Sequence, residues 1–335
     1  MDISDFLCKF AAPKYYKNII MKRKNLMLLA WPLMLLLAFA SCEKVSFDES
    51  EESSSSVPSD ANLVLKVVTG GTRGEEVPWT TLIFVVYQSG EKVKAVTQHV
   101  GDKQFGETGM KLTPGTYQVM VLAHSSASNP SQSDPTNVKF TNSDGFSDTF
   151  GACQDIVVEE TPQTHEIKMN RMSAMVRFKT KDVKPAEAKR IRFLYTGGSG
   201  AINLLTGYGV DASTQTVFFD LPDSLIGKRL QFELYTFPRT DDAKLKLLVS
   251  MLDAKGELIG YPGAPSGIRT IEDIPVKRNQ ITECSGYFFT NGSGDNGDDD
   301  DDTDGNQGGN TGEDSDVSFT IVVDTKWDNV LTFGY

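Results

Sequence analysis

One cysteine, Cys42, stands in the sequence context of a covalent lipid modification. Three basic residues, Lys22 to Lys24, precede an apolar run from Leu26 to Ala40, and Ser41 separates this run from the cysteine. This order is typical of a bacterial secretory signal peptide that ends in a lipobox. At a lipobox a signal peptidase cleaves before the cysteine, whose thiol carries a diacylglycerol group. We therefore predict that residues 1–41 are removed and that lipidated Cys42 tethers the mature chain to a membrane.

Two other interpretations of this leader stay open. The apolar run could be a transmembrane helix, but it is shorter than the ~20 residues that a bilayer core requires, and Pro32 interrupts it. Cys42 could also be an ordinary thiol behind a conventional cleavage site, since Phe39 stands where a lipobox usually carries an aliphatic residue. A second methionine, Met21, begins a more usual signal peptide, so we expect translation to start there.

Beyond residue 42 the sequence contains two cysteines, Cys153 and Cys284. In an exported chain they could form a disulfide between distant segments, because oxidising compartments favour such bonds. They could equally be two separate thiols. The sequence does not decide between these alternatives.

The histidines do not form a catalytic or zinc site in the sequence. His99, His124 and His165 are scattered, and none has a cysteine at zinc-ligand spacing. Ser125 and Ser126 follow His124 directly, but no nucleophile elbow surrounds them. We expect His99 and His165 to be ordinary strand residues.

Two further motifs match ligand-binding loops only in part. The run from Asp300 to Gly305 matches the first half of a calcium loop, but the twelfth position holds Thr311 instead of a bidentate glutamate. The glycine-rich segment from Thr196 to Gly200 lacks the lysine of a phosphate-binding loop and is better interpreted as a turn. We therefore predict a protein without enzymatic activity, cofactor or metal.

The negative charge of the chain argues against negatively charged partners. The formal net charge of the whole chain is −12. Residues 1–41 have a net charge of +4, so the net charge of the mature part is −16. Such an acidic surface argues against nucleic-acid binding and against direct adhesion to anionic lipid. Removing 41 residues from 335 leaves 294, enough for two domains of ordinary size.

Two stretches have compositions that cannot form a packed core. Residues 42–61 are acidic and serine-rich, so we expect a disordered tether. The acidic residues of this tether from Asp48 to Glu52 resemble a lipoprotein surface-export signal, although a merely solvated linker would look the same. Residues 291–316 contain no apolar residue and form an acidic Gly/Asp linker. The strand expected beyond it, Val317–Val323, can return to its own sheet or pair with another molecule.

Between these stretches the sequence predicts short β-strands. Residues 230–234 alternate apolar and polar side chains, as a half-buried antiparallel strand requires. The best helix candidate is the short stretch Pro185–Arg190. A first series of expected strands comprises Leu63–Val68, Leu82–Tyr87, Val93–His99, Gly109–Leu112, Tyr117–Ala123, Gln154–Val158 and His165–Met169. A second series comprises Ala174–Lys179, Arg190–Tyr195, Leu204–Gly207, Thr216–Asp220, Gln231–Phe237, Lys244–Leu252, Ile274–Val276 and Ile281–Phe289. We predict an all-β fold of two tandem β-sandwich domains, residues 62–168 and 169–335.

The segment Leu112–Tyr117 is a more specific fold signal. Pro114 and Gly115 predict a tight turn with the glycine at positive φ, and a strand then opens with Tyr117. This L-x-P-G-x-Y pattern resembles that of transthyretin-like Greek-key sandwiches, so it bears on fold more than on function.

Several motifs, taken in order, resemble the FimB-like family of fimbrial anchor lipoproteins, the basal subunits of type V fimbriae in Gram-negative anaerobes. They are the lipobox at Cys42, the strand Leu63–Val68 followed by Thr72 and Arg73, the LTPGTYQV segment from Leu112, the segment Met169–Ala174, the segment Val276–Gln280 leading to Cys284, and the strand Phe319–Val323 followed by Trp327. Together they extend over nearly the whole mature chain.

The resemblance implies two transthyretin-like sandwiches and assembly by strand exchange, in which a segment of one subunit completes the sheet of the next. In this family shaft pilins lose their first strand by cleavage at an arginine that follows it, whereas anchors keep it. Arg73 occupies that position here, so proteolytic processing after Arg73 is an alternative for this chain.

We therefore expect a surface-exposed lipoprotein of the outer membrane that acts as a fimbrial anchor and binds shaft pilins. One alternative is a surface glycan-binding lipoprotein of a carbohydrate-uptake system, which would usually present exposed aromatic platforms. The other is a shaft or tip pilin processed after Arg73.

Overall fold

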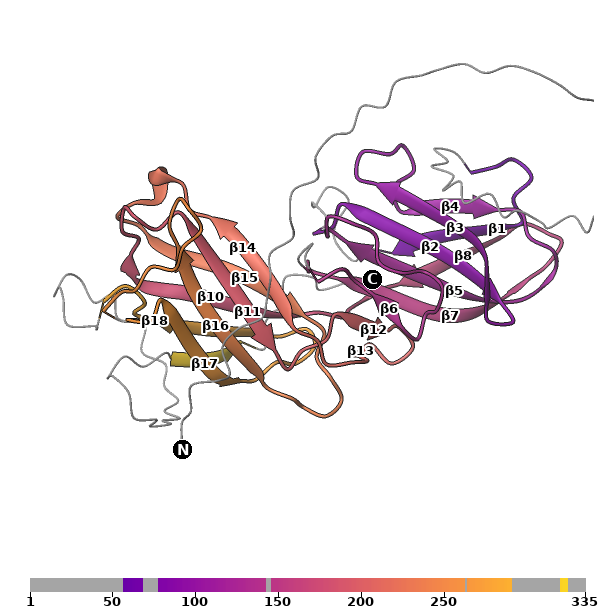
Figure 1. Cartoon of the computed structure of the whole chain (residues 1–335). Helices are drawn as coiled ribbons and strands as arrows, with labels where there is room; N and C mark the ends of the chain where they lie inside the picture. The colour runs from indigo at the N-terminus through magenta and orange to yellow at the C-terminus, as the bar shows by residue number, and fades with distance from the viewer. Residues whose placement is uncertain (1–56, 69–77, 143–145, 263, 291–319, 325–335) are drawn as a thin grey trace, which may run out of the picture. The chain divides into compact units, whose positions relative to one another are not determined.

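The computed structural model describes residues 57–68, 78–142, 146–262, 264–290 and 320–324, and these form an all-β protein (Figure 1). The described residues contain nineteen strands and one short 3-10 helix, Asp223–Leu225. The predicted all-β class is therefore confirmed. None of the helical structure in the described ranges is long and apolar enough to cross a bilayer. The predicted signal peptide, most of the tether and the acidic linker lie outside the described residues.

The first sheet pair is built from residues 63–171. Its three-stranded sheet has the order β4 (Glu107–Met110), β1 (Leu63–Val68), β8 (Gln163–Lys168), and its five-stranded sheet has the order β3 (Glu91–His99), β2 (Thr81–Gln88), β5 (Gly115–His124), β7 (Phe150–Val158), β9 (Asn170–Arg171). β1 runs antiparallel to β4 and parallel to β8. The apolar residues that alternate along β1 pack against those of β2 and β5, so the two sheets enclose one core.

The second sheet pair is built from eight strands between Ala174 and Asp324. One sheet has the order β15 (Arg229–Thr236), β10 (Ala174–Val183), β18 (Ile281–Gly286), β19 (Thr320–Asp324), and the other has the order β14 (Gln215–Asp220), β11 (Arg190–Thr196), β16 (Leu245–Leu252), β17 (Ile268–Ile274). The alternation of buried and exposed residues along β10, β11 and β15 matches the sequence pattern. Aromatic rings fill the core between the sheets, with Phe193 in contact with Phe178, Phe219 and Phe232.

A third, small sheet covers the outer face of the five-stranded sheet. It has the order β13 (Tyr208–Gly209), β12 (Ala201–Asn203), β6 (Val138–Lys139), so it joins a segment of the first half to a segment of the second. Ile83 and Val85 of β2 form a core with Ile202 and Phe237. β2 is therefore buried on both faces, which explains why its sequence is continuously apolar instead of alternating.

Three sequence predictions of secondary structure are wrong in detail. Leu204–Gly207 is a turn and not a strand, because the Asn203 side chain accepts hydrogen bonds from the backbone N–H groups of Leu205 and Thr206. Pro185–Arg190 contains no helix, since the chain passes directly from β10 to β11. The strand expected at Ile274–Val276 lies earlier, as β17.

The turn at Pro114 also differs from the prediction. Gly115 does not adopt positive φ; it is already extended, begins β5 and pairs with Val158. The corner is instead held by Tyr117, whose hydroxyl donates to the Thr113 carbonyl at 2.8 Å and lies 2.9 Å from the Thr113 hydroxyl. A bond from a buried tyrosine to the backbone a few residues upstream resembles the tyrosine corner described for β-sandwich domains.

Replacing Tyr117 by Phe tests the corner. The ring stays buried while the bonds to Thr113 are lost, so we expect the free energy of unfolding to fall by about 1 kcal/mol. Chemical denaturation of the purified mature protein measures this change. Tyr208→Phe removes the same hydroxyl from a half-exposed ring and should change stability by less. Equal losses for the two variants would contradict the assignment.

Candidate functional site

The two residues predicted to be modified, Cys42 and Arg73, lie outside the described residues. The described element between them in sequence is β1, the central strand of its sheet. Leu63 and Leu65 of β1 are 0% exposed, and Val67 is buried beside them. Because β1 forms ladders with both β4 and β8, the sheet is continuous only while this strand is in place.

A buried asparagine fixes the N-terminal end of β1. The side-chain amide of Asn62 donates to the carbonyls of Leu112 (2.9 Å) and Glu159 (2.7 Å), and its side-chain oxygen accepts the Leu112 N–H at 2.8 Å. Its backbone is paired with Met110 and Gln163. Asn62 thus ties the end of β1 to the segments that follow β4 and β7.

The C-terminal strand β19 returns to its own chain. It pairs antiparallel with β18, with Cys284 opposite Ile321, and this is the intramolecular arrangement of the two that the sequence allowed. Val323 is 41% exposed and Val322 is 54% exposed, so neither side chain belongs to a core. Only Ile321 packs against the second core. β19 is therefore an edge strand held mainly by its ladder hydrogen bonds. Trp327 lies outside the described residues.

The two remaining cysteines are separate free thiols. Cys284 is buried in the core of the second sheet pair, whereas Cys153 lies on β7, half-buried against the small sheet. The disulfide that the sequence left open is therefore not formed in the structure. Burial raises the pKa of Cys153 to about 11 and that of Cys284 to about 12, so neither thiol is activated as a nucleophile.

The histidines lie in or at the ends of strands, as expected for His99 and His165. His99 of β3 and His124 of β5 flank Thr81 of β2, so the sheet brings two of the three histidines to neighbouring strands. His165 is bonded to Gln163 within β8. Within the described ranges, no group of three or more histidine, cysteine or acidic side chains could hold a metal ion.

His124 is fully buried and couples stability to pH. Desolvation lowers its pKa from 6.5 to about 4. The unfolded chain then binds more protons than the folded chain between these values, so stability is lost as the pH falls from about 6.5 to 4. We expect this site to contribute a loss of about 2–3 kcal/mol. The free energy of unfolding of the His124→Phe variant should depend less steeply on pH across this range than that of the wild type. An unchanged slope in His124→Phe would contradict the assignment.

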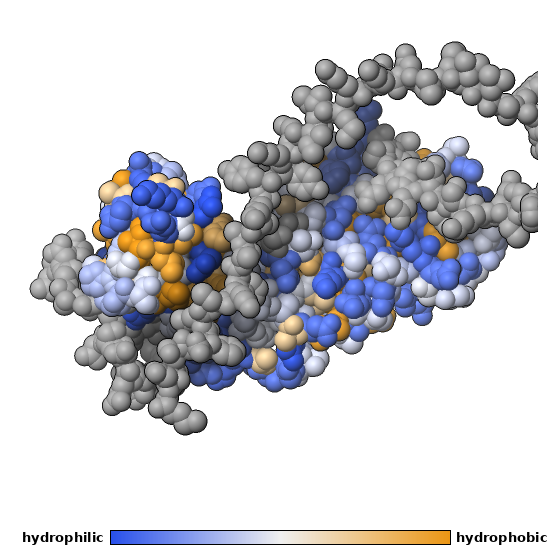
Figure 2. Space-filling view, in the orientation of Figure 1, coloured by the Kyte–Doolittle hydropathy of each residue, from blue (hydrophilic) through white to orange (hydrophobic). Residues whose placement is uncertain are grey.

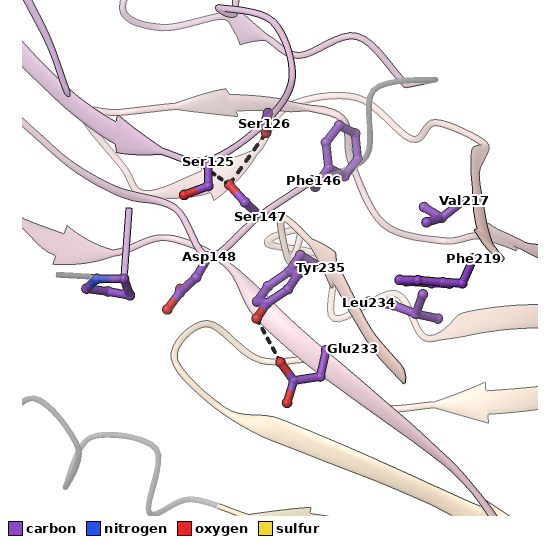
Figure 3. A pocket seen from close by; sticks show the side chains of 11 residues that line it. Ser125, Ser126, Phe146, Ser147, Asp148, Val217, Phe219, Glu233, Leu234 and Tyr235 are labelled. Atoms are coloured by element: carbon purple, nitrogen blue, oxygen red, sulfur yellow. Dashed lines mark hydrogen bonds between the residues drawn. The ribbon is translucent and has the colours of Figure 1, made fainter. Parts of the chain in front are cut away.

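A pocket of about 440 Å³ opens beside β14 and β15, the edge strands on one side of the second sheet pair (Figure 3). Loops that follow β5 and precede β7 form its other side. Its lining comprises Pro78, Ser125, Ser126, Phe146, Ser147, Asp148, Val217, Phe219, Glu233, Leu234 and Tyr235. No single stretch of sequence contains this combination, and only Ser125 and Ser126 stood out in the sequence.

Hydrophobic residues also reach the surface away from this pocket. Figure 2 shows them gathered on the second sheet pair, whereas the visible face of the first sheet pair mixes polar and apolar residues. The exposed large side chains of the second half include Val183, Phe218, Ile226 and Leu258. Phe218 lies on the edge strand β14 and carries the Arg190 guanidinium over its ring.

A buried ion pair lies behind the pocket. The Arg171 guanidinium makes bidentate hydrogen bonds to Asp148 at 2.9–3.1 Å and donates to the Asn279 side chain at 3.0 Å. The Ser173 hydroxyl also donates to Asp148. Burial raises the pKa of the Asp148 carboxyl, and the bonds from Arg171 and Ser173 oppose this shift. The cluster joins the loop before β7 to the segment that precedes β18.

Removing the cation of this pair should be costly. The side chains of Arg171 and Asp148 are 5% and 12% exposed, so Arg171→Met leaves a buried carboxylate without its counter-ion. We expect a loss of about 3–5 kcal/mol in the free energy of unfolding. The matched control is Arg190→Met, because the Arg190–Asp220 pair is 50% and 78% exposed and should contribute about 0–1 kcal/mol. Thermal and chemical denaturation of both variants measure the difference, and similar losses would refute it.

The fold defines an all-β protein with an open pocket beside β14 and β15. The chain belongs to DUF6562, a family of unknown function, whose family model matches residues 72–331. No curated protein matches the chain.

Solved structures with partial similarity come from adhesion and fimbrial proteins. A candidate adhesin from Bacteroides ovatus shares 13% identity at a TM-score of 0.44, over 63% of this chain and 82% of that one. The fimbrial anchor protein Mfa2 from Porphyromonas gingivalis shares 11% at 0.38, over 67% and 90%. A fimbrial assembly protein from Parabacteroides distasonis shares 11% at 0.33, over 68% and 90%. TM-scores below 0.5 do not transfer a function.

Proposed function

We propose that this protein is a non-enzymatic lipoprotein of the outer membrane that serves as the anchor of a fimbria. The observation that carries the proposal is the position of β1. A lipid on Cys42 holds the fold to the membrane only if the chain stays continuous from Cys42 through β1 to the rest of the sheet. β1 is the central strand of that sheet, so the tether would end inside the fold and not at its periphery.

Loss of β1 would strongly destabilise the first sheet pair. This favours an anchor, which keeps the strand, over a subunit that loses it by processing. Its departure would separate β4 from β8 and remove Leu63, Leu65 and Val67 from the first core. Each such side chain contributes about 1.5–3 kcal/mol when fully buried. Asn62 adds side-chain bonds to Leu112 and Glu159. An anchor retains this strand, whereas a processed shaft subunit gives it up.

The proposal includes two tandem transthyretin-like Greek-key domains, residues 62–168 and 169–335. The two sheet pairs and the tyrosine corner at Tyr117 support it. Shaft pilins are the proposed partners, and β-strand exchange is the proposed mode of assembly. β19 supports this mode because an edge strand that buries mainly Ile321 can be replaced by a strand from another subunit at little cost in apolar contact.

The experiment combines fractionation with mass spectrometry of protein from cells. Wild type should sediment with the outer membrane, and Cys42→Ala should be released from it because the multiple acyl chains are lost. Cys153→Ala removes a thiol of the folded part and should stay with the membrane. Peptides that span Thr72, Arg73 and Gly74 should be found in the membrane-bound protein.

Two results would count against the anchor. A mature N-terminus at Gly74 would favour a shaft or tip pilin processed after Arg73. Retention of Cys42→Ala in the membrane fraction would refute the lipid anchor itself.

A further inference from the structure

We propose that the pocket beside β14 and β15 binds an uncharged saccharide. The inference does not rest on the fimbrial role, because it follows from the chemistry of the pocket walls alone. A sugar ring has an apolar face of C–H groups and a rim of hydroxyls, and the pocket offers a complementary surface to each.

One wall of the pocket is apolar and aromatic. Val217, Phe219 and Tyr235 are half-buried on this wall, so their side chains are partly accessible from the pocket, and buried Leu234 also lines it; half-buried Phe146 belongs to the other wall. In Figure 3 Val217, Phe219 and Leu234 lie together on one side of the pocket, Phe146 lies with the three serines on the other side, and Tyr235 lies between them. Aromatic faces carry partial negative charge and attract the polarised C–H groups of a sugar ring.

The opposite wall carries three serine hydroxyls. The Ser147 hydroxyl oxygen accepts the Ser125 N–H at 2.7 Å, and the Ser125 hydroxyl oxygen accepts the Thr80 N–H at 3.0 Å. One acceptor site of each hydroxyl is thus used by the backbone, while its proton can be donated to a ligand. Ser126 lies 3.5 Å from Ser147, hydroxyl to hydroxyl, so this weak bond can be exchanged for one to a ligand.

The two carboxylates of the pocket are already paired with cations. Arg171 and Ser173 saturate Asp148 with four hydrogen bonds. Arg177 donates to one oxygen of Glu233, and the Tyr235 hydroxyl donates to the other at 3.2 Å. The second oxygen of Glu233 retains an acceptor site for a sugar hydroxyl. A cationic ligand gains little electrostatic attraction from these carboxylates, because Arg171 and Arg177 already neutralise their charge. An anionic ligand is repelled by the same carboxylates at close range.

The size of the pocket agrees with such a ligand. Ligand pockets usually have volumes of about 300–1,000 Å³, with mostly apolar walls and a few fixed polar groups. A volume of about 440 Å³ lies at the small end of that range. The pocket therefore suits a short saccharide unit and not a long chain buried along its whole length.

Binding is tested with the full mature chain. The probes are neutral glucose, galactose, mannose, N-acetylglucosamine and their short oligomers, first immobilised as an array and then free in calorimetry. Glucuronic acid and glucosamine are the anionic and cationic comparison probes. We expect binding of at least one neutral probe and at least tenfold weaker binding of its charged counterpart.

Ser126→Leu locates the site by filling the pocket. It should weaken binding of the neutral probe at least tenfold, whereas Ala127→Leu adds the same bulk to an exposed position of the same loop and should leave binding unchanged. Amide chemical shifts of Ser126, Ser147 and Tyr235 in the wild type should move on titration, which tests the location even if Ser126→Leu fails to fold.

The proposal is overturned by any of three results. They are no neutral probe bound at millimolar concentration, preferential binding of a charged probe, and unperturbed shifts at the pocket. Equal affinity of a folded Ser126→Leu variant would overturn it as well. None of these results bears on whether the protein is retained in the membrane, so the anchor proposal is judged separately.

Discussion

The structure depends on the burial of the five-stranded sheet on both of its faces. One face of β2 and β5 packs against β1, and the other packs against the small sheet of β6, β12 and β13. Because β12 and β13 come from the second half of the chain, the first half obtains its second core only when the second half is present. The halves are therefore joined by shared apolar surface and not merely by a linker. The shared core also places the loop before β7 next to β14 and β15, and the pocket lies between them.

The buried ion pair of Arg171 and Asp148 restricts how the layers in this apolar contact can rotate relative to one another. Hydrophobic burial is non-directional, so it tolerates small rotations between packed layers. A bidentate guanidinium does not, because both of its hydrogen bonds require a fixed plane. With Asn279 as a second hydrogen-bond partner, Arg171 links the segments on both sides of the junction. The same pair neutralises a carboxylate in the pocket, so the residues that orient the halves also determine the charge that a ligand meets.

Most strands could be predicted from the sequence because their burial alternates or is continuously apolar. β1, β10 and β15 follow the alternation of Val, Phe and Leu with polar residues. β6, β9 and β13 could not be predicted, since a strand of two residues has no periodicity and exists only through its neighbours. Gly115 was misassigned because Pro-Gly suits a turn, while the ladder with Val158 holds it extended. The pocket combines loops and edges far apart in sequence, so no local pattern could reveal it.

Each sheet pair contains a parallel pairing between an early and a late strand. In the first pair Leu63 lies opposite Gln163, and in the second pair Met175 lies opposite Ile281. Contacts this distant slow folding, because the intervening chain must be brought together before the pairing contributes. During vectorial synthesis the opening strand of each half emerges well before its partner. Its apolar residues then lack their final neighbours and are exposed to aggregation. The order of the strands therefore lengthens the time during which these apolar residues are exposed before the last strand pairs.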